Sequence, residues 1–500
     1  MSGRLLSHAE RVRVEATSTL DTVSQAVQGQ YFTPEKAAAL IAGLPTLLRT
    51  NVLRVLDPGA GSGMLTAAVV ERACREGGVD AIEVTAVESD ASLLPALHQT
   101  VRLCEQWGRD HNMLVRVKVV AGDLIRMQSG LDAELGTNYD LVIMNPPYKK
   151  LGSASWQRKA LKLSGWEVTN LYSAFLAIGV DSLRCSGQLV AITPRSFANG
   201  PYFGQFRRRL LAEVAFNRVH TFESRSTVFG DTGVLQENVV FSATKAGPRG
   251  AVVITSSRDH TDEVMSRTVG YNELVSPADP HQFIRITPDE ASCEAVKAVE
   301  ALPASLTALG LKVSTGKVVD FRARQNLHNV PQPGYLPLVY PGNLRQGEVH
   351  WPRQIGKAQA FSLVEESDRK ALLPSGYYVL VKRFSAKEER RRIVAAVWDP
   401  TRHQGKPVAF ENHLNVFHKN GMGLDRELAW GLCLWLNSTI VDRYFRTFSG
   451  HTQVNATDLR SLNYPDQPTL RRLGQATDHL PEQGDLDQLV EEMTQELVPA

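Results

Sequence analysis

The stretch "NVLRVLDPGAGSG" (residues 51–63) joins a short β-rich run to a glycine-rich turn, and the helical stretch "MLTAAVVERACREG" follows it. Glycines let the backbone pass close beneath a ligand, and the free amides of a helix N-terminus can bind that ligand. The spacing is not that of the phosphate-binding pattern GxxxxGK[ST]. Taken alone, the stretch is also compatible with a tight strand–helix turn that holds no ligand.

The flanking sequence repeats this alternation of strand and helix. Strands are predicted at residues 82–90, 114–125 and 139–148, and the helical stretch "SLLPALHQTVRLCEQWG" separates the first two. A further strand and loop, "QLVAITPRSFANG", is followed by two more strands that end by residue 245. This spacing predicts an α/β fold with a doubly wound, mostly parallel, Rossmann-like sheet. In such sheets, ligands bind at the carboxyl ends of the strands.

Acidic residues end two of the predicted strands. Glu88 closes the second strand in "TAVESD", where a carboxylate can accept hydrogen bonds from both hydroxyls of a ribose. Asp123 closes the third strand in "AGDL", where it can accept a bond from an adenine amino group. Taken alone, each acid is more often a solvated loop residue. Together, at the ends of successive strands, they favour a cofactor that contains adenosine.

The fourth strand ends in Asn145-Pro146-Pro147-Tyr148. An exocyclic amine or amide nitrogen is a poor nucleophile, because its lone pair is delocalised. The side-chain oxygen of Asn145 and the carbonyl of Pro146 can accept both of its N–H bonds and stabilise the charge that develops during alkylation. The rigid prolines aim that carbonyl, and Tyr148 offers a ring for stacking. A plain double-proline turn is the structural alternative.

The order of these motifs resembles that of the Rossmann-like S-adenosylmethionine-dependent amino-methyltransferases, in particular the gamma class of DNA methyltransferases. In that class an "FTP" segment precedes the cofactor motifs, as "QYFTP" does here, with Thr33 also expected to cap a helix that has Pro34 at its first position. The resemblance implies S-adenosylmethionine as the cofactor. The residues expected to bind it are Phe32, Thr33, Pro34, Asp57, Pro58, Gly59, Gly61, Gly63, Glu88, Asp123 and Asn145.

The stretches "NPPYKK", "TNLYSAFL", "ITPRSFANGPYFGQFR" and "VLQENVVF" resemble the BsuBI/PstI-type restriction–modification methyltransferases more specifically. This family methylates N6 of adenine in double-stranded CTGCAG, so the resemblance implies a site-specific adenine DNA methyltransferase. It also implies that the target base is flipped out and held between Tyr148 and Phe229. The catalytic residues expected are Asn145, Pro146, Pro147, Tyr148 and Phe229, although Phe229 alone can equally be a core residue.

Composition sets limits on the type of protein. The 500 residues carry a formal net charge of +2, which excludes a histone-like polycation but allows a local basic cleft. The five cysteines lie far apart, and none is spaced for zinc, so we expect reduced thiols, no metal and a cytoplasmic protein. No apolar stretch is long enough to span a membrane, so no membrane partner is expected.

The sequence predicts four parts. A helical leader at residues 1–28 precedes a catalytic domain at 29–250; an α+β target-recognition domain at 251–465 and a loosely attached acidic tail or helix at 466–500 follow. One long apolar helix is expected over residues 426–448.

Several polar and basic residues are candidates for DNA contacts. Lys149 and Lys150, just beyond the NPPY motif, can neutralise phosphates or be solvated surface residues. The candidates in the recognition domain are Arg322, Arg324, Lys382, Arg383, His451, Gln453 and Asn455. The run at residues 390–392 is compatible with phosphate contacts or with a solvated charged face.

Other functions remain open at this level. NPPY also occurs in enzymes that methylate RNA adenines or glutamine side chains, and a non-catalytic DNA-binding protein that kept the fold is a different class of alternative. The expected partner is double-stranded DNA, bound by a monomer. Any cognate restriction endonuclease is expected to be a separate protein.

Overall fold

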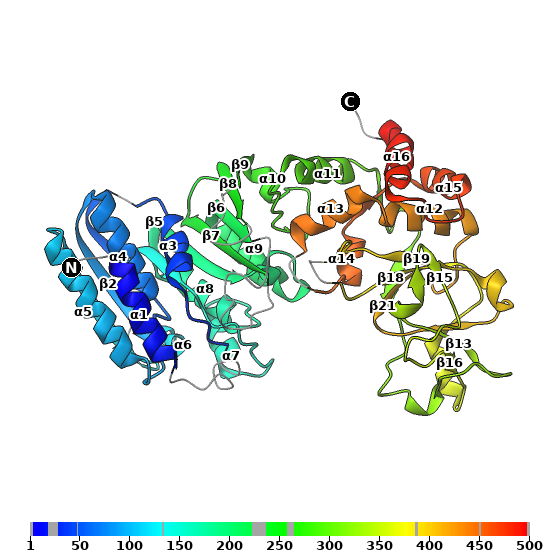
Figure 1. Ribbon diagram of the computed structural model, residues 1–500, viewed down its shortest axis with the longest axis horizontal. Helices are drawn as coiled ribbons and strands as arrows, with labels where there is room; N and C mark the ends of the chain where they lie inside the picture. Colours follow the sequence, from blue (N-terminus) through cyan, green and yellow to red (C-terminus); the bar gives the residue numbers. More distant parts are fainter. Residues whose placement is uncertain are drawn as a thin grey trace. The chain divides into compact units, whose positions relative to one another are not determined.

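The computed structural model describes residues 4–18, 29–47, 49–132, 135–222, 237–257, 265–385, 389–449 and 452–497 (Figure 1). The chain forms two compact units, Met1–Pro288 and Asp289–Ala500. Among the described residues, no helix is long and apolar enough to cross a membrane.

The first unit is built on a nine-stranded sheet in the order β3-β2-β1-β4-β5-β7-β6-β8-β9. The first five strands are mutually parallel, and β7 runs antiparallel to both of its neighbours. This sheet confirms the predicted α/β fold. The strands are β1 (Thr50–Asp57), β2 (Val79–Glu88), β3 (Leu114–Ala121), β4 (Tyr139–Met144), β5 (Leu183–Pro194), β6 (Val214–Phe222), β7 (Asn238–Lys245), β8 (Ala251–Ser257) and β9 (Met265–Gly270).

Helices cover both faces of this sheet, as the alternation of side chains along β4 shows. Leu141 and Ile143 join one apolar cluster, whereas Val142 and Met144 join the other. Helices on the first face are α1 (Leu5–Ser18), α3 (Glu35–Gly43), α4 (Met64–Glu76) and α5 (Leu94–Asp110). The other helices in the described part of this unit are α6 (Leu124–Gln128), α7 (Trp156–Leu163), α8 (Leu171–Ser182), α9 (Gly204–Glu213) and α10 (Tyr271–Leu274). Because β4 is buried along its whole length, its end is a rigid support for the residues that follow.

The sheet extends beyond the predicted domain boundary. β8 pairs parallel to β6, and β9 pairs antiparallel to β8, so residues 251–270 belong to the first unit and not to the recognition domain. Alternating strand patterns cannot reveal whether a strand joins the preceding sheet or starts a new one. The N-terminal helix α1 is likewise part of this unit: Leu5, Leu6 and Ala9 are buried, and Arg4 pairs with Glu71 at 3.0 Å.

The second unit is α+β, as predicted, with small sheets and six helices in its described part. The six-stranded sheet has the order β11-β21-β18-β19-β15-β14, the five-stranded sheet the order β12-β16-β13-β20-β17, and β10 pairs with β22. The strands are β10 (Ala304–Ser305), β11 (Lys312–Thr315), β12 (Leu327–His328), β13 (Leu336–Val339), β14 (Leu344–Arg345), β15 (Glu348–Val349), β16 (Ala360–Phe361), β17 (Leu372–Leu373), β18 (Tyr378–Lys382), β19 (Ala395–Trp398), β20 (Val408–Phe410), β21 (Leu414–His418) and β22 (Asn463–Tyr464). The helices are α11 (Glu290–Glu300), α12 (Arg426–Leu436), α13 (Thr439–Phe448), α14 (Ala456–Arg460), α15 (Gln467–Ala476) and α16 (Gln483–Thr494).

The long helix expected at residues 426–448 is in fact two helices, α12 and α13. The break falls at Asn437 and Ser438, and the amide of Asn437 exchanges hydrogen bonds with the backbone of Ala395 in β19. A side-chain amide that forms hydrogen bonds with backbone groups outside its helix favours the end of that helix over its continuation. The apolar pattern continues across the break because both helices pack against the interior.

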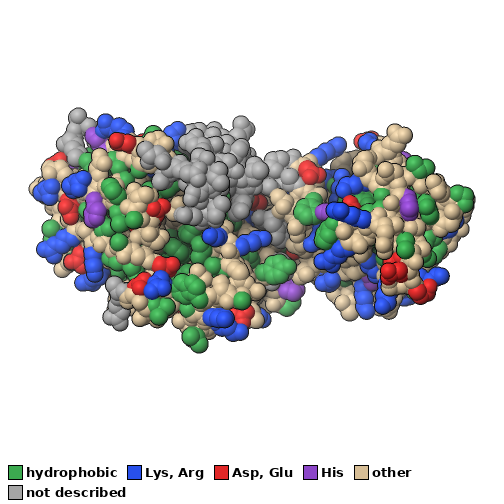
Figure 2. Space-filling model, turned by 90° about the horizontal axis from the view of Figure 1, so that it is seen from below, with side chains coloured by type: hydrophobic (Ala, Val, Ile, Leu, Met, Phe, Trp, Pro, Cys, Tyr) green, Lys and Arg blue, Asp and Glu red, His purple; other side chains and the backbone are tan. Residues whose placement is uncertain are grey.

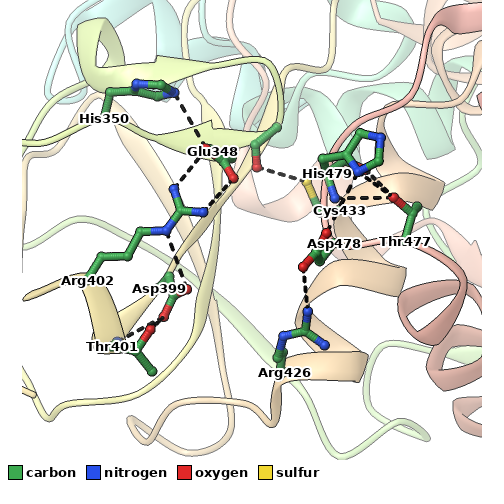
Figure 3. Close-up of polar contacts among 11 residues, drawn as sticks. Glu348, His350, Asp399, Thr401, Arg402, Arg426, Cys433, Thr477, Asp478 and His479 are labelled. Carbon is green, nitrogen blue, oxygen red and sulfur yellow. Dashed lines mark hydrogen bonds and ion pairs between the residues drawn. The ribbon is translucent and has the colours of Figure 1, made fainter.

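The last described helices, α15 and α16, are firmly packed and do not form the loosely attached tail that was predicted. Leu470 and Leu473 are fully buried. A Cβ on Gly474 would lie 1.8 Å from the carbonyl oxygen of Glu427, so the backbones of α15 and α12 are in direct contact. Figure 3 shows polar contacts in this region, including the ion pair of Arg426 with Asp478 at 2.9 Å.

Candidate active site

The candidate site lies at the carboxyl ends of neighbouring parallel strands. Asp57 ends β1, Glu88 ends β2, and Asn145 directly follows β4. Since β1 pairs with both β2 and β4, these three residues lie along one edge of the sheet.

The glycine-rich turn is held against β2. Gly61 and Gly63 adopt positive φ angles of 56° and 89°, which glycine accommodates without strain, and α4 begins at the next residue. The amides of Gly61 and Asp90 each donate to a different oxygen of Glu88, both at 2.7 Å. Burial raises the pKa of the Glu88 carboxyl. Each carboxylate oxygen can accept a further bond, so this side chain suits ribose hydroxyls.

Asp57 is completely buried beneath the turn. Its Oδ2 accepts from the hydroxyl of Thr66 at 2.8 Å, while Oδ1 has no hydrogen-bond partner among the described residues. Burial, with a smaller effect of the nearby Glu88 charge, raises the pKa of Asp57 to about 7. A buried acceptor without a partner is costly, and it fits a donor group supplied by a bound cofactor.

Asp123 follows β3, next to β2, but part of its side chain serves the local fold. Its Oδ1 caps α6 by accepting from the amides of Ile125 and Arg126 at 2.8 and 3.2 Å. The amide of Gly122 donates to the carbonyl of Glu88 at 2.9 Å, which holds the two acidic residues at adjacent strand ends.

The segment before α3 lies along the NPPY motif. The amide of Tyr148 donates to the carbonyl of Gly29 at 3.0 Å. Gly29 has φ +68°, and a Cβ there would lie 2.9 Å from the Lys149 nitrogen, so only glycine fits this close approach. Phe32 lies beside the glycine-rich turn, since a Cβ on Gly61 would be 3.7 Å from its ring.

Thr33 does not cap α3, contrary to the prediction. Pro34 occupies the cap position, and no side chain caps the helix. The Thr33 hydroxyl instead accepts a 3.0 Å hydrogen bond from the side-chain nitrogen of Asn145, which also donates to the carbonyl of Tyr31 at 2.8 Å. Both N–H bonds of the amide are thus used. Its Oδ1 therefore faces the other way, where it accepts a 3.3 Å bond from the Tyr148 hydroxyl.

Tyr148 belongs to a row of aromatic side chains. Its ring centroid lies 5.3 Å from that of Tyr31 and 6.3 Å from that of Tyr172, and Tyr172 stacks on Phe203 at 5.6 Å. Burial raises the pKa of Tyr148 well above its usual value, so the phenol is a neutral donor. Such a row offers apolar, flat surfaces beside the acceptor oxygen of Asn145.

Gly29 and Tyr31 are site residues that the sequence reasoning missed. In "GQYFTP", Tyr31 directly precedes the FTP segment and Gly29 stands two residues before Tyr31, so an extension of that motif is the signal that could identify them. Two predicted residues, Phe229 and His451, lie outside the described part of the chain. Lys149 and Lys150 are exposed, as a phosphate contact requires.

The predicted DNA-contact residues of the second unit differ in their surroundings. Arg322 and Arg324 are exposed, Lys382, Arg383 and Gln453 are half-buried, and Asn455 directly precedes α14 at its N-cap position. Figure 2 shows that Lys and Arg side chains outnumber acidic ones on the visible face of this unit, at the right.

Both interpretations of the run at residues 390–392, phosphate contacts or a solvated face, hold for only part of it, because Arg390 is exposed and Arg391 and Arg392 are not. Arg392 is 1% exposed and donates to the hydroxyls of Ser385 and Ser449. Arg391 is half-buried and donates to the carbonyl of Ser438 at 3.1 Å, and burial lowers its pKa. Charge runs in a sequence carry no sign of burial, because buried arginines are held by distant partners.

Comparisons with known proteins agree with this geometry. A model of the Eco57I restriction-modification methylase family matches residues 114–229. The chain is 38% identical over 491 residues to the type II methyltransferase M.PstI of Providencia stuartii, covering 97% of this chain and 96% of that protein. It is 40% identical over 479 residues to the type II methyltransferase M.BsuBI of Bacillus subtilis, covering 94% of each.

Weaker similarities extend further. A tRNA1(Val) (adenine(37)-N6)-methyltransferase of Salmonella arizonae is 27% identical over 178 residues, which are 34% of this chain and 65% of that protein. Among solved structures, the type IIL restriction-modification enzyme MmeI in complex with DNA superposes with a TM-score of 0.57 at 12% identity, covering 99% of this chain and 73% of that chain, which shows a shared fold. The identity to M.PstI and M.BsuBI over nearly the whole chain decides the family. The chain belongs to the type II restriction–modification methyltransferases represented by M.PstI and M.BsuBI, and its methyl donor is S-adenosylmethionine.

Proposed function

We propose that this methyltransferase transfers the methyl group to N6 of an adenine flipped out of double-stranded DNA. The orientation of the Asn145 amide carries the proposal. Its nitrogen is held by the Tyr31 carbonyl and the Thr33 hydroxyl, so its oxygen is available as an acceptor for an exocyclic amino group. A flat amine on an aromatic ring suits that acceptor together with the aromatic row beside it.

The residues of the chain would position and polarise the amine. Asn145 Oδ1 and the Pro146 carbonyl accept hydrogen bonds from its two N–H groups, which favours a pyramidal nitrogen whose lone pair is no longer delocalised into the ring. They also stabilise the positive charge that grows on the nitrogen as the new bond forms. The neutral Tyr148 phenol donates to Asn145 Oδ1 and keeps that oxygen in place. No strong base is needed, since the product nitrogen loses its proton once it is alkylated.

Bound S-adenosylmethionine supplies an electrophilic methyl group. The side chains that would hold it are those at the strand ends and the glycine-rich turn. Glu88 would bind the ribose, Asp123 the adenine amino group, and Phe32 the methionine end, where it lies beside Gly61. The unpaired Oδ1 of Asp57 would accept a hydrogen bond at the turn.

The flipped base would stack between Tyr148 and Phe229, which compensates for lost stacking in the duplex. Lys149 and Lys150 would neutralise phosphates beside the flipped nucleotide. The second unit would read the sequence, with a CTGCAG-like site as the first to test. We further propose that the enzyme acts as a monomer in the cytoplasm, where its DNA substrate lies, and that any cognate endonuclease is a separate protein.

Modification-sensitive sequencing of DNA from cells that express the chain tests the proposal. We expect N6-methyladenine in one sequence context, and none with Asn145→Ala, although that variant should still bind the duplex. Transfer assays with purified protein should show activity on the duplex and none on an RNA of the same sequence. Methylated cytosine, or activity confined to RNA, would overturn the proposal; the tRNA methyltransferase relative makes RNA the substrate to compare.

A further inference from the structure

One surface of the second unit is assembled from four segments that are distant in sequence: residues 316–324, 383–385, 411–415 and 452–455. We call it the four-segment surface. Residues 316–318 pair with the turn after β20, because the amide of Gly316 donates to the Leu414 carbonyl at 2.8 Å and that of Asn412 to the Val318 carbonyl at 2.9 Å. The other two segments are joined to this turn by the hydrogen bonds described next.

Arg383 connects the remaining segments. Its amide donates to the carbonyl of His413 at 2.9 Å, and its carbonyl accepts from the amide of Val454 at 2.7 Å. The side-chain amide of Asn415 also donates to the Val454 carbonyl at 2.7 Å. A continuous backbone network therefore holds the four segments in fixed register, which a surface that reads base edges requires.

The four-segment surface is basic. Its cationic side chains come from Lys317, Arg322, Arg324 and Arg383. Both of its acidic side chains have partners: Asp320 forms an ion pair with Lys357 at 3.0 Å, and Glu411 accepts a hydrogen bond from His413 Nδ1. The net positive charge fits a phosphate backbone.

Two exposed side chains of the four-segment surface, Phe384 and His413, have no role in the proposed function. Phe384 is 44% exposed, which is unusual for a phenylalanine, and its ring centroid lies 5.0 Å from that of His413. The His413 side chain is 52% exposed, whereas its partner Glu411 is 2% exposed. A solvated surface does not require a histidine held by a buried carboxylate beside an exposed aromatic ring, so this arrangement indicates a binding role.

Glu411 determines which nitrogen of the imidazole is available to a ligand. Its Oε1 lies 2.5 Å from His413 Nδ1, and its Oε2 accepts from the His413 amide at 2.9 Å. A carboxylate can only accept, so Nδ1 carries a proton, and in the neutral imidazole the acceptor is then Nε2. Within the described part of the chain, no residue bonds to Nε2.

We propose that His413 is a specificity-determining residue that accepts, through Nε2, a hydrogen bond from an exocyclic amino group in the major groove of the target duplex. Adenine N6 and cytosine N4 present such a donor, whereas guanine O6 and thymine O4 are acceptors that Nε2 rejects. Phe384 packs against the adjoining base, and Glu411 is a positioning residue that acts through His413. This inference rests on the proposed action on DNA.

The test compares wild type with His413→Ala and Phe384→Ala on a randomised duplex library, read by modification-sensitive sequencing. His350→Ala is the matched control, because the His350 side chain is also 52% exposed and lies beside a glutamate, Glu348, outside the four-segment surface (Figure 3). We expect wild type and His350→Ala to require adenine or cytosine, and to exclude guanine and thymine, at one position of one strand. His413→Ala should accept the other bases there, with discrimination lowered about tenfold.

Base analogues then separate the two sources of the donor. Purine in place of adenine, or 2-pyrimidinone in place of cytosine, removes the amino group at the identified position. The analogue should slow wild type and His350→Ala about tenfold and leave His413→Ala no slower than with the natural base. Phe384→Ala should weaken transfer without relaxing the base preference.

The outcomes separate this inference from the proposed function. If wild type methylates a defined DNA sequence and His413→Ala keeps the same selectivity, the role of His413 is wrong and the proposed function stands. If wild type methylates no duplex DNA, both are wrong. An equal loss of selectivity in His350→Ala would also overturn the inference, because it would show a nonspecific effect.

Discussion

The hydrogen bond from Asn145 to Thr33 can be removed without changing the shape of the side chain. Thr33→Val replaces the buried hydroxyl with a methyl group, so the Asn145 nitrogen keeps the Tyr31 carbonyl as a partner and loses the 3.0 Å bond to Thr33. Thr33→Ser is the matched control, since it keeps the hydroxyl and loses the methyl group. The prediction is that valine slows methyl transfer and serine does not.

The size of the effect follows from one buried hydrogen bond. Such a bond contributes about 0.5–1.5 kcal/mol, which corresponds to roughly a twofold to thirteenfold decrease in rate if it acts fully in the transition state. The amide loses one of two restraints on its orientation, so its oxygen spends less time facing the substrate. We expect the affinity for S-adenosylmethionine to remain unchanged, because the hydroxyl is directed at Asn145.

The assay is a single-turnover measurement, with enzyme in excess over duplex and a radiolabelled methyl group, so that product release does not limit the observed rate. Cofactor affinity is measured separately by calorimetry, and thermal melting checks the fold. Two results would refute the reasoning. One is a normal rate for Thr33→Val; the other is weaker cofactor binding with no change in rate, which would make Thr33 a cofactor contact.

Three further predictions concern other parts of the chain. Burial raises the pKa of Asp57 to about 7 from 3.8, so the folded state binds more protons than the unfolded state between these two values. As the pH rises from about 4 to about 7, the free energy of unfolding of wild type, relative to that of Asp57→Asn, should therefore fall by roughly 1.4 kcal/mol per pH unit and then level off. Parallel pH profiles of the two proteins in urea unfolding would contradict this. Gly29→Ala should slow single-turnover transfer, because its Cβ would lie 2.9 Å from the backbone nitrogen of Lys149. An unchanged rate would argue that this close contact is not the reason why the position holds a glycine. Arg392→Ala should lower the melting temperature and leave the salt dependence of DNA binding unchanged, whereas Arg322→Ala should reduce its slope by about one; the opposite pattern would return Arg392 to the DNA-contact residues.

Local patterns in the sequence were sufficient to predict where strands of the first unit end. The run before Asp57 and the glycines after it predict a strand, a turn and a helix, and the structure has β1, the turn and α4 there. The buried run before Asn145 likewise forms β4. These features depend on apolar periodicity and on glycine conformations, both of which act over a few neighbouring residues.

Such local patterns cannot predict hydrogen-bond partners that are distant in the sequence. Asn145 is 112 residues from Thr33, and their hydrogen bond exists because the chain before α3 crosses the end of β4. The same limit explains β8 and β9, because a local pattern cannot show which sheet a strand joins. It also explains Arg392, which looks like a surface charge until α13 and its neighbours enclose it.

The sequence by itself determined the class of fold, the edge of the sheet that carries the motifs, and the family. Only the tertiary structure decided which atoms face one another: the Asn145 nitrogen toward Tyr31 and Thr33, and the Glu411 carboxylate toward His413. The reason is physical. Secondary structure follows from the preferences of adjacent residues, whereas the direction of a side-chain amide or imidazole is set by partners that only the packing of distant segments brings within hydrogen-bonding distance.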